Sequence, residues 1–201
     1  MTDTRTSRGG RSGGRQPPAS PRVEGGRLTR KRLQNPRKDS IKTIRTSAVR
    51  IGDRIFVVQK MPMKMIWKMP AMERVELVKG GVPSVILTRL SRALDRPVKY
   101  VVRTIGMAPT SASRKLQRQT PLAPDESERA LGVAKLIGQV ETIVQQSGNP
   151  AGFDPGRWVA EWIETPQPAL GGRRPDALLD TAEGQLMVSD LLARMQSGAY
   201  S

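Results

Sequence analysis

Cysteine and histidine are both absent from the 201 residues of this chain. Without cysteine there is no disulfide and no thiolate metal ligand, which suits a reducing compartment. Without histidine, the commonest general base and the commonest metal ligand are missing. The sequence also shows no nucleophile–base arrangement, no metal-ligand cluster and no phosphate-binding glycine loop between a strand and a helix. It therefore predicts a protein that is not an enzyme and that binds neither a metal nor a cofactor.

Aromatic and other apolar side chains are scarce. Trp, Tyr and Phe make up 3% of the residues, and the apolar residues together make up 37%. So small an apolar fraction predicts that the full length does not fold around one core. No apolar run approaches the roughly 18 to 20 residues that a bilayer-spanning helix needs, and no signal-peptide core follows the start. The sequence therefore predicts a cytoplasmic protein that does not enter a membrane.

The positive charge is unevenly distributed along the chain. The net charge is +16, from 34 Lys and Arg against 18 Asp and Glu. Residues 1–50 hold fourteen basic side chains against three acidic ones, and residues 51–120 hold fourteen against four; residues 121–201 hold six against eleven. A polyanion is attracted to a basic surface and repelled by an acidic one. The pattern indicates two partners, with nucleic acid at the basic front; the alternative is that the basic tail only confers solubility.

The beginning of the chain has almost nothing to bury, because residues 1–40 consist mainly of Gly, Arg, Pro, Ser and Thr. Such a segment cannot offset the entropy that ordering costs, so we predict a disordered basic arm over residues 1–54. This arm contacts DNA phosphates, has no function of its own, or precedes a true start of the protein at Met61, Met63 or Met65.

An apolar lead-in segment is predicted over residues 55–70. Ile55 to Val58 has β-propensity, which predicts a short strand or an irregular segment. Pro62 and Pro70 interrupt the rest. Its methionines are expected to pack loosely against the helices that follow.

From residue 71 the apolar residues follow a helical period, and we predict an all-α domain over residues 71–147. Prolines at first-turn positions and glycines after last turns mark the boundaries, including those of helices 109–118 and 124–146. The apolar residues that define the helices are Met72, Val75 and Val78; Val85, Ile86, Leu87, Leu90 and Leu94; Val98, Val101, Val102 and Ile105; Ala112 and Leu116; and Leu131, Ala134, Leu136, Ile137 and Val140.

Two of these helices, joined by a turn at Gly106, have the order of a helix-turn-helix. Ala112 and Leu116 are expected to hold the second helix down, so its other side chains face solvent. Arg and Lys can donate to guanine edges, Gln can pair with adenine, and Ser or Thr can bond phosphate. The alternative is a solvated basic helix in an all-α domain. The candidate DNA-binding residues are Thr110, Ser111, Ser113, Arg114, Lys115, Gln117 and Arg118.

A small acidic module is predicted over residues 154–201. Asp154 is a helix N-cap before a first-turn proline, and Trp158, Val159, Trp162 and Ile163 share one face of the helix that follows. The last helix is expected to begin at a capping box of Asp180 and Glu183 and to end at Gly198. Its apolar stripe is too wide for so small a module to bury, which indicates either packing on the preceding helices or a partner surface. That stripe comprises Leu186, Met187, Val188, Leu191, Leu192 and Met195.

The end of the chain resembles the Xre/MbcA/ParS antitoxins, whose partners are RES-domain toxins. The similar residues are Trp162-Ile163, Pro166, Pro168, Leu170-Gly171-Gly172, Pro175, Leu178-Leu179-Asp180-Thr181, Gly184, Val188, Leu191-Leu192 and Gly198. The helix-turn-helix part is also similar, including Leu122-Ala123-Pro124-Asp125-Glu126-Ser127-Glu128-Arg129. The segment from Gln145 to Arg157 is longer and richer in Gly and Pro than is usual in the family.

The resemblance implies that the terminal module docks on an NAD-consuming RES toxin, with the extreme end approaching the toxin's active site. Arg173 and Arg174 either pair with toxin carboxylates or brace the turn at Pro175. The toxin-binding residues expected on this basis are Trp162, Leu170, Arg173, Arg174, Leu191, Leu192, Met195 and Tyr200.

Two functions follow from these patterns. The first is an antitoxin that occludes its RES toxin and represses its own operon by binding double-stranded operator DNA, as a homodimer if it follows the family. The alternative is a stand-alone helix-turn-helix regulator that has no toxin partner.

Overall fold

The computed structural model describes residues 48–51, 54–148 and 150–197. Contacts divide the chain into two units, Met1–Gln34 and Asn35–Ser201, and every described residue lies in the second. The predicted disordered arm therefore lies almost wholly outside the described residues. Gly198 and Tyr200 also lie outside them. Within the described ranges no helix combines the length and the apolarity that crossing a bilayer requires.

The described residues are mostly helical, which confirms the predicted all-α class, and a two-stranded antiparallel hairpin precedes the helices. In the hairpin, Ala48 pairs with Val57 and Ile51 pairs with Arg54. In chain order the elements are β1 (Ala48–Ile51), β2 (Arg54–Val57), η1 (Val58–Lys60), α2 (Met63–Lys68), α3 (Ala71–Gly80), α4 (Val85–Ala93), α5 (Val98–Thr104), α6 (Pro109–Arg118), α7 (Pro124–Gln146), α8 (Pro155–Ile163), η2 (Pro168–Leu170), η3 (Pro175–Leu178) and α9 (Ala182–Ser197).

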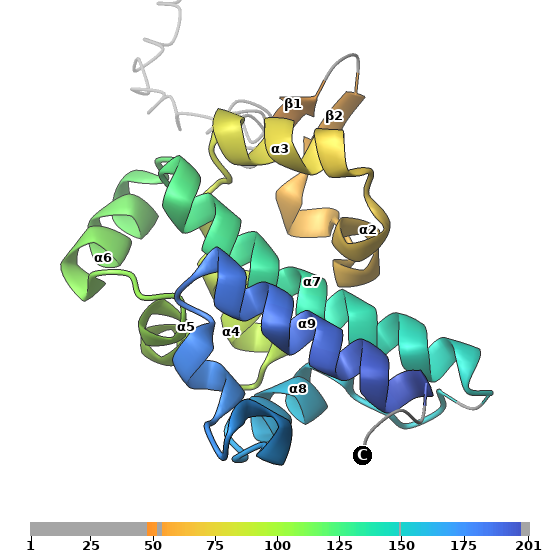
Figure 1. Cartoon of the computed structure of the whole chain (residues 1–201). Coiled ribbons are helices and arrows are strands. Elements are labelled where there is room, and N and C mark those ends of the chain that lie inside the picture. The colour runs from red at the N-terminus through yellow and green to blue at the C-terminus, as the bar shows by residue number, and fades with distance from the viewer. Residues whose placement is uncertain (1–47, 52–53, 149, 198–201) are drawn as a thin grey trace, which may run out of the picture. The chain divides into compact units, whose positions relative to one another are not determined.

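The helix α7 is the centre of the fold. It packs against α2, α3, α4, α8 and α9, and α9 runs alongside it (Figure 1). Its middle is buried on every side, as expected for a helix surrounded by others. Leu131, Ala134, Leu136, Ile137 and Val140, which the helical period selected, are all at most 4% exposed, so that prediction is confirmed.

The predicted lead-in is an ordered part of this core. The strand expected near Ile55 is present as β2, but the helix α2, bounded by Pro62 and Pro70, was not predicted. Ile66 of α2 is 1% exposed. The guanidinium of Arg89 donates to the carbonyls of Val58 and Met61, and Arg74 donates to that of Met69. These two arginine side chains thus donate to carbonyl groups in and beside the short helices η1 and α2.

The α2–α7 contact is close because Gly138 has no side chain. A β-carbon on Gly138 would lie 2.3 Å from the carbonyl oxygen of Met63 and 2.8 Å from the backbone nitrogen of Lys64. The backbone of α2 therefore occupies the space that any other residue at 138 would need.

The helix α3 is present where the sequence indicated, but it buries a different side. Leu77 is 1% exposed, whereas Met72 is 70% exposed and Val75 is 41% exposed. Val78 is partly buried. The face that carries Met72 and Val75, which were predicted to be buried, is therefore directed largely to solvent.

Of the N-terminal caps predicted for the last two helices, the one for α8 is confirmed and the one for α9 is wrong. The Asp154 carboxylate accepts hydrogen bonds from the backbone N–H groups of Gly156 and Arg157, both at 3.0 Å, which confirms it as the N-cap of α8. For α9 the prediction of Asp180 was wrong by one residue. Because α9 begins at Ala182, it is the Thr181 hydroxyl that accepts from Gly184 N–H, at 3.0 Å.

Buried side-chain amides fix the position of α9 along α7. The Gln139 side-chain amide donates to the Ser189 backbone carbonyl at 2.9 Å, and the Ser189 hydroxyl donates to Oε1 of Gln139 at 2.8 Å. The Gln185 amide donates to the carbonyls of Arg129 and Leu179. A shift of α9 by one turn would leave these polar groups buried and unpaired, at a cost of about 1 to 3 kcal/mol each.

Candidate functional site

The helix α6 carries an exposed polar and basic surface. Pro109 begins the helix, Ala112 is buried and Leu116 is partly buried, so these two hold it on α5 as predicted. Figure 1 shows α6 at the edge of the helical body, next to α5. Of the candidate DNA-binding residues, the structure exposes Thr110, Ser113, Arg114, Gln117 and Arg118 and leaves Ser111 half-buried.

Lys115 is held differently from the other candidates. Its ammonium donates to the Glu126 carboxylate at 2.6 Å, and the two side chains are 18% and 13% exposed. The same carboxylate oxygen accepts from Ala123 N–H at 2.7 Å at the start of α7. The Ser84 hydroxyl donates to the Lys115 carbonyl at 3.1 Å. Lys115 therefore ties α6 to α7, and its charge is already neutralised within the protein.

The turn between α5 and α6 requires a glycine. Gly106 has φ of 62°, a left-handed conformation that disfavours side chains. A β-carbon there would also lie 2.9 Å from the β-carbon of Asp180. The turn of the helix-turn-helix thus lies directly against the C-terminal part of the chain.

Two exposed basic residues on α5, Lys99 and Arg103, escaped the sequence analysis. The Arg103 guanidinium lies 5.5 Å from the centre of the Tyr100 ring. Burial, and to a smaller extent the neighbouring Glu164 carboxylate, raise the pKa of Tyr100 to about 12. The signal for Lys99 and Arg103 was available, because both lie in the acid-free stretch from Arg96 to Pro124.

In the C-terminal part, several side chains that were expected to bind the toxin are buried in the hydrophobic core. Trp162 is 9% exposed, Leu191 is 1% and Leu192 is 2%. The Trp162 ring stacks on Trp158, with centroids 5.7 Å apart. These side chains pack α8 and α9 onto the body, so burial leaves them almost no surface for a partner.

Other members of that set are accessible. Leu170 is half-buried, Arg173 and Arg174 are exposed, and Met195 is 36% exposed. Tyr200 lies outside the described residues. The apolar stripe of α9 is indeed wider than the fold buries, because Leu186 is 52% exposed and Met187 is 45% exposed.

The two neighbouring arginines differ in their contacts. Arg174 donates to both carboxylate oxygens of Asp176, at 3.1 and 2.5 Å, and so braces the turn before η3. Arg173 forms hydrogen bonds through its backbone: its carbonyl accepts from Gln167 N–H at 3.0 Å, and its N–H donates to the Leu170 carbonyl at 3.3 Å. Its guanidinium makes no hydrogen bond or ion pair with another described residue, which leaves it available to a partner.

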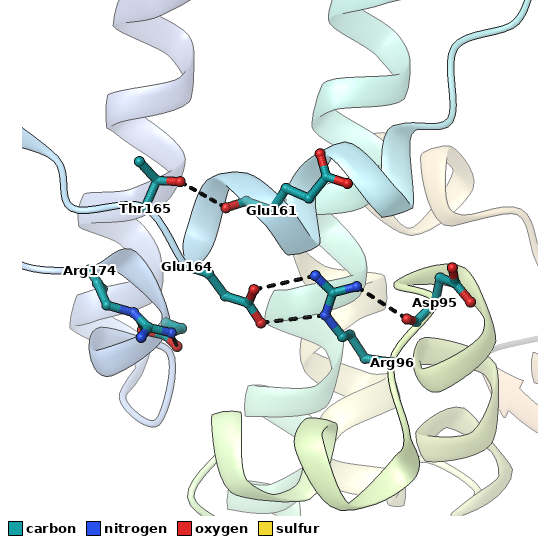
Figure 2. A network of polar contacts seen from close by, with 7 residues as sticks. Asp95, Arg96, Glu161, Glu164, Thr165 and Arg174 are labelled. Carbon is teal, nitrogen blue, oxygen red and sulfur yellow. Dashed lines mark hydrogen bonds and ion pairs between the residues drawn. The ribbon is translucent and has the colours of Figure 1, made fainter.

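Ion pairs join the loop between α4 and α5 to α8 and its C-terminal end, and Figure 2 shows the one between Arg96 and Glu164. Arg96 donates to both oxygens of Glu164 at 3.3 and 3.4 Å, and Arg157 donates to Asp95 at 3.1 Å. The hydrogen bond from Arg96 lowers the pKa of Glu164 below its ordinary value, and the carboxylate raises the pKa of Arg96. The pair therefore connects the helix-turn-helix region to the C-terminal part.

This ion pair predicts a pH dependence of stability. A carboxylate whose pKa is lowered by folding stabilises the fold above its unfolded pKa, and the contribution disappears as pH falls through the folded pKa. Glu164→Gln should therefore lower the melting temperature at pH 7 and have less effect as pH falls below about 5. Thermal unfolding at several pH values measures this, with Asp190→Asn as the control, because Asp190 is exposed on α9 and forms no ion pair with another described residue. A difference that does not shrink toward low pH would contradict the role of the pair.

Comparison with known proteins agrees with this arrangement. Residues 73–135 match the antitoxin Xre-like helix-turn-helix domain, and residues 153–198 match the antitoxin Xre/MbcA/ParS C-terminal toxin-binding domain. The chain is 39% identical over 138 residues to the "Prs ADP-ribosylating antitoxin" of Sphingobium sp. (strain YBL2), a span of 69% of this chain and 87% of that protein.

The chain belongs to the Xre/MbcA/ParS antitoxin family. It is also 29% identical over 127 residues to "Antitoxin Xre" of Yersinia enterocolitica, covering 63% of this chain and 80% of that protein. The helix-turn-helix match runs from α3 into α7, and the toxin-binding match runs from just before α8 through α9. The antitoxin is thus a toxin-binding regulator with a helix-turn-helix domain, and not an enzyme. The hairpin and α2 lie outside both matched segments.

Proposed function

We propose that this antitoxin neutralises a RES-domain toxin that consumes NAD, by occluding the toxin's active site. The observation that carries the proposal is the similarity to the Sphingobium antitoxin, whose name contains ADP-ribosylation. ADP-ribosyl groups are taken from NAD, so the proposal assigns NAD to the toxin and no cofactor to the antitoxin.

The accessible residues of the C-terminal domain make the contact in this proposal. Arg173 donates to a carboxylate of the toxin, Leu170 and Met195 contribute apolar surface, and Tyr200 approaches the active site. Trp162, Leu191 and Leu192 act indirectly, because they hold α8 and α9 in place. Arg174 shapes the turn that presents Arg173.

The second part of the proposal is repression of the antitoxin's own operon. The helix α6 enters the major groove, where Arg114, Arg118 and Gln117 can reach base edges or phosphates and Thr110 and Ser113 can bond phosphates. A homodimer would place two such helices on half-sites about 34 Å apart. This activity places the protein in the cytoplasm, with the operator and the toxin.

Co-expression with the RES toxin encoded beside the antitoxin gene tests the first part. The full-length chain should restore growth, and Arg173→Glu should weaken the affinity for purified toxin at least about tenfold, because a favourable charge pair becomes a repulsive one. Point variants are preferable to a truncation, since removing α9 would also remove Val188 and Leu191 from the core.

Arg118→Glu is the matched control, an exposed charge reversal on α6 that should leave toxin binding unchanged. Failure of the full-length chain to restore growth would remove the toxin-binding proposal. Equal affinities of the wild type and of Arg173→Glu would move the contact away from this turn.

A further inference from the structure

A groove of about 380 Å³ lies between α3, α7 and α9. Its apolar lining comes from all three helices and includes Val75, Val78, Leu131 and Leu186. Its charged lining is mainly basic: Arg74, Lys79 and Lys135 stand against the single acid Glu128. The groove therefore suits an apolar side chain that is accompanied by a carboxylate.

The outer face of α3 continues this groove. Met72, Val75, Glu76 and Lys79 follow one another at the three- and four-residue spacing of a single helix face, and all four are exposed. On the other side, α9 exposes Leu186 and Met187. Of the seven large apolar side chains exposed among the described residues, four thus belong to α3 and this part of α9. Such a concentration is typical of a protein–protein interface.

Lys135 lines the groove without a carboxylate of the described residues in contact with its ammonium. This side chain of α7 is half-buried, and its ammonium forms no hydrogen bond or ion pair with another described residue. Burial, and to a smaller extent the neighbouring Arg74, lower the pKa of Lys135, while Glu128 provides only a longer-range attraction. A carboxylate brought by a partner would compensate this charge.

We propose that the occupant of the groove is a second copy of this chain, docked through α3 about a two-fold axis. The stripe on α3 supplies what the groove lacks, because Met72 and Val75 are apolar and Glu76 is an accessible carboxylate. Each copy inserts its Met72 into the groove of the other and places its Glu76 beside the other's Lys79 and Lys135. A two-fold axis makes each of these contacts twice, as in most homodimers. This inference rests on the homodimer of the proposed function and places the dimer interface at α3.

Sedimentation of the full-length chain over a wide range of concentration tests the proposal. The wild type should dimerise, and Met72→Lys should raise the dimer dissociation constant at least about a hundredfold, because it places a further positive charge in a groove that already holds Arg74, Lys79 and Lys135. Met65→Lys, at an exposed methionine of α2 that does not line the groove, is the matched control and should leave the dimer intact. Unchanged melting temperatures would show that both variants fold.

A charge exchange provides a second test. Glu76→Lys should weaken the dimer about tenfold, and the double variant with Lys79→Glu should recover most of that loss, since the paired charges are restored in reverse. A monomeric wild type would remove both the homodimer and this surface. A dimer that tolerates Met72→Lys would remove the surface alone, and so would a Met72→Lys variant that keeps its dimer but loses affinity for the toxin.

Discussion

Gly138→Ala is expected to destabilise the antitoxin by about 2 to 3 kcal/mol, although alanine is the better helix former. The new β-carbon would meet the backbone of α2 at Met63 and Lys64, with the closest atom 2.3 Å away. Backbone atoms cannot rotate aside as the end of a side chain can. The helix α2 would therefore have to shift, and Met63 and Ile66 would lose contacts with α7.

Thermal unfolding with Gly80→Ala as the matched control checks this prediction. A β-carbon at Gly80 meets only a side-chain atom of Val49, at 3.9 Å, so this control should melt at or slightly above the wild-type temperature. Gly138→Ala should melt roughly 4 to 12 °C lower, given about 2 to 4 °C for each kcal/mol in a chain of this size. Equal melting temperatures for the two variants would mean that α2 does not pack on α7 as described.

The double variant Arg114→Ala, Arg118→Ala is expected to bind operator DNA about a hundredfold more weakly at moderate salt. Both guanidinium groups lie on the exposed face of α6, and neither has an ion-pair partner among the described residues. If both contact phosphates, the slope of log affinity against log salt should fall by about 1.8, or about 0.9 for each lost contact. Fluorescence anisotropy with an operator duplex at several salt concentrations measures both quantities.

Lys115→Ala tests whether DNA binding depends on the exposed face of α6 or on positive charge in general. Because the ammonium is paired with Glu126, we expect this variant to lose stability and to keep the wild-type salt slope. All variants keep the basic N-terminal residues, so their contribution cancels in the comparison. A slope that falls equally for Lys115→Ala, or that stays unchanged for the double variant, would place DNA binding elsewhere in the chain.

The sequence was sufficient to predict a helix where that helix buries a regular stripe of apolar residues. The period of Leu131, Leu136 and Val140 predicted α7, and Pro109 with Ala112 and Leu116 predicted α6 and its exposed face. These patterns are local, since the helical repeat and the residues at its ends lie within one segment. The cap at Asp154 is local for the same reason.

Tertiary contacts decided the features that the sequence did not reveal. The helix α2 has only six residues, and its stability comes from α7 and from Arg89, a distant residue of α4 that holds the segment just before α2. Lys115 looked like its neighbours because its partner Glu126 lies across a loop. The apolar stripe of α9 could not show which side faces α7, so buried Leu191 and exposed Leu186 looked equivalent.

The amide contacts between α7 and α9 have a consequence for the lifetime of the antitoxin in the cell. A protease must draw an unfolded segment into its active site, and the rate depends on how often that segment detaches. Gln139 and Gln185 fasten the terminal helix to the most deeply buried helix of the fold, so its detachment should require much of the free energy of global unfolding. Degradation that begins within α9 would then be slow, and turnover would depend on cleavage at other points of the chain.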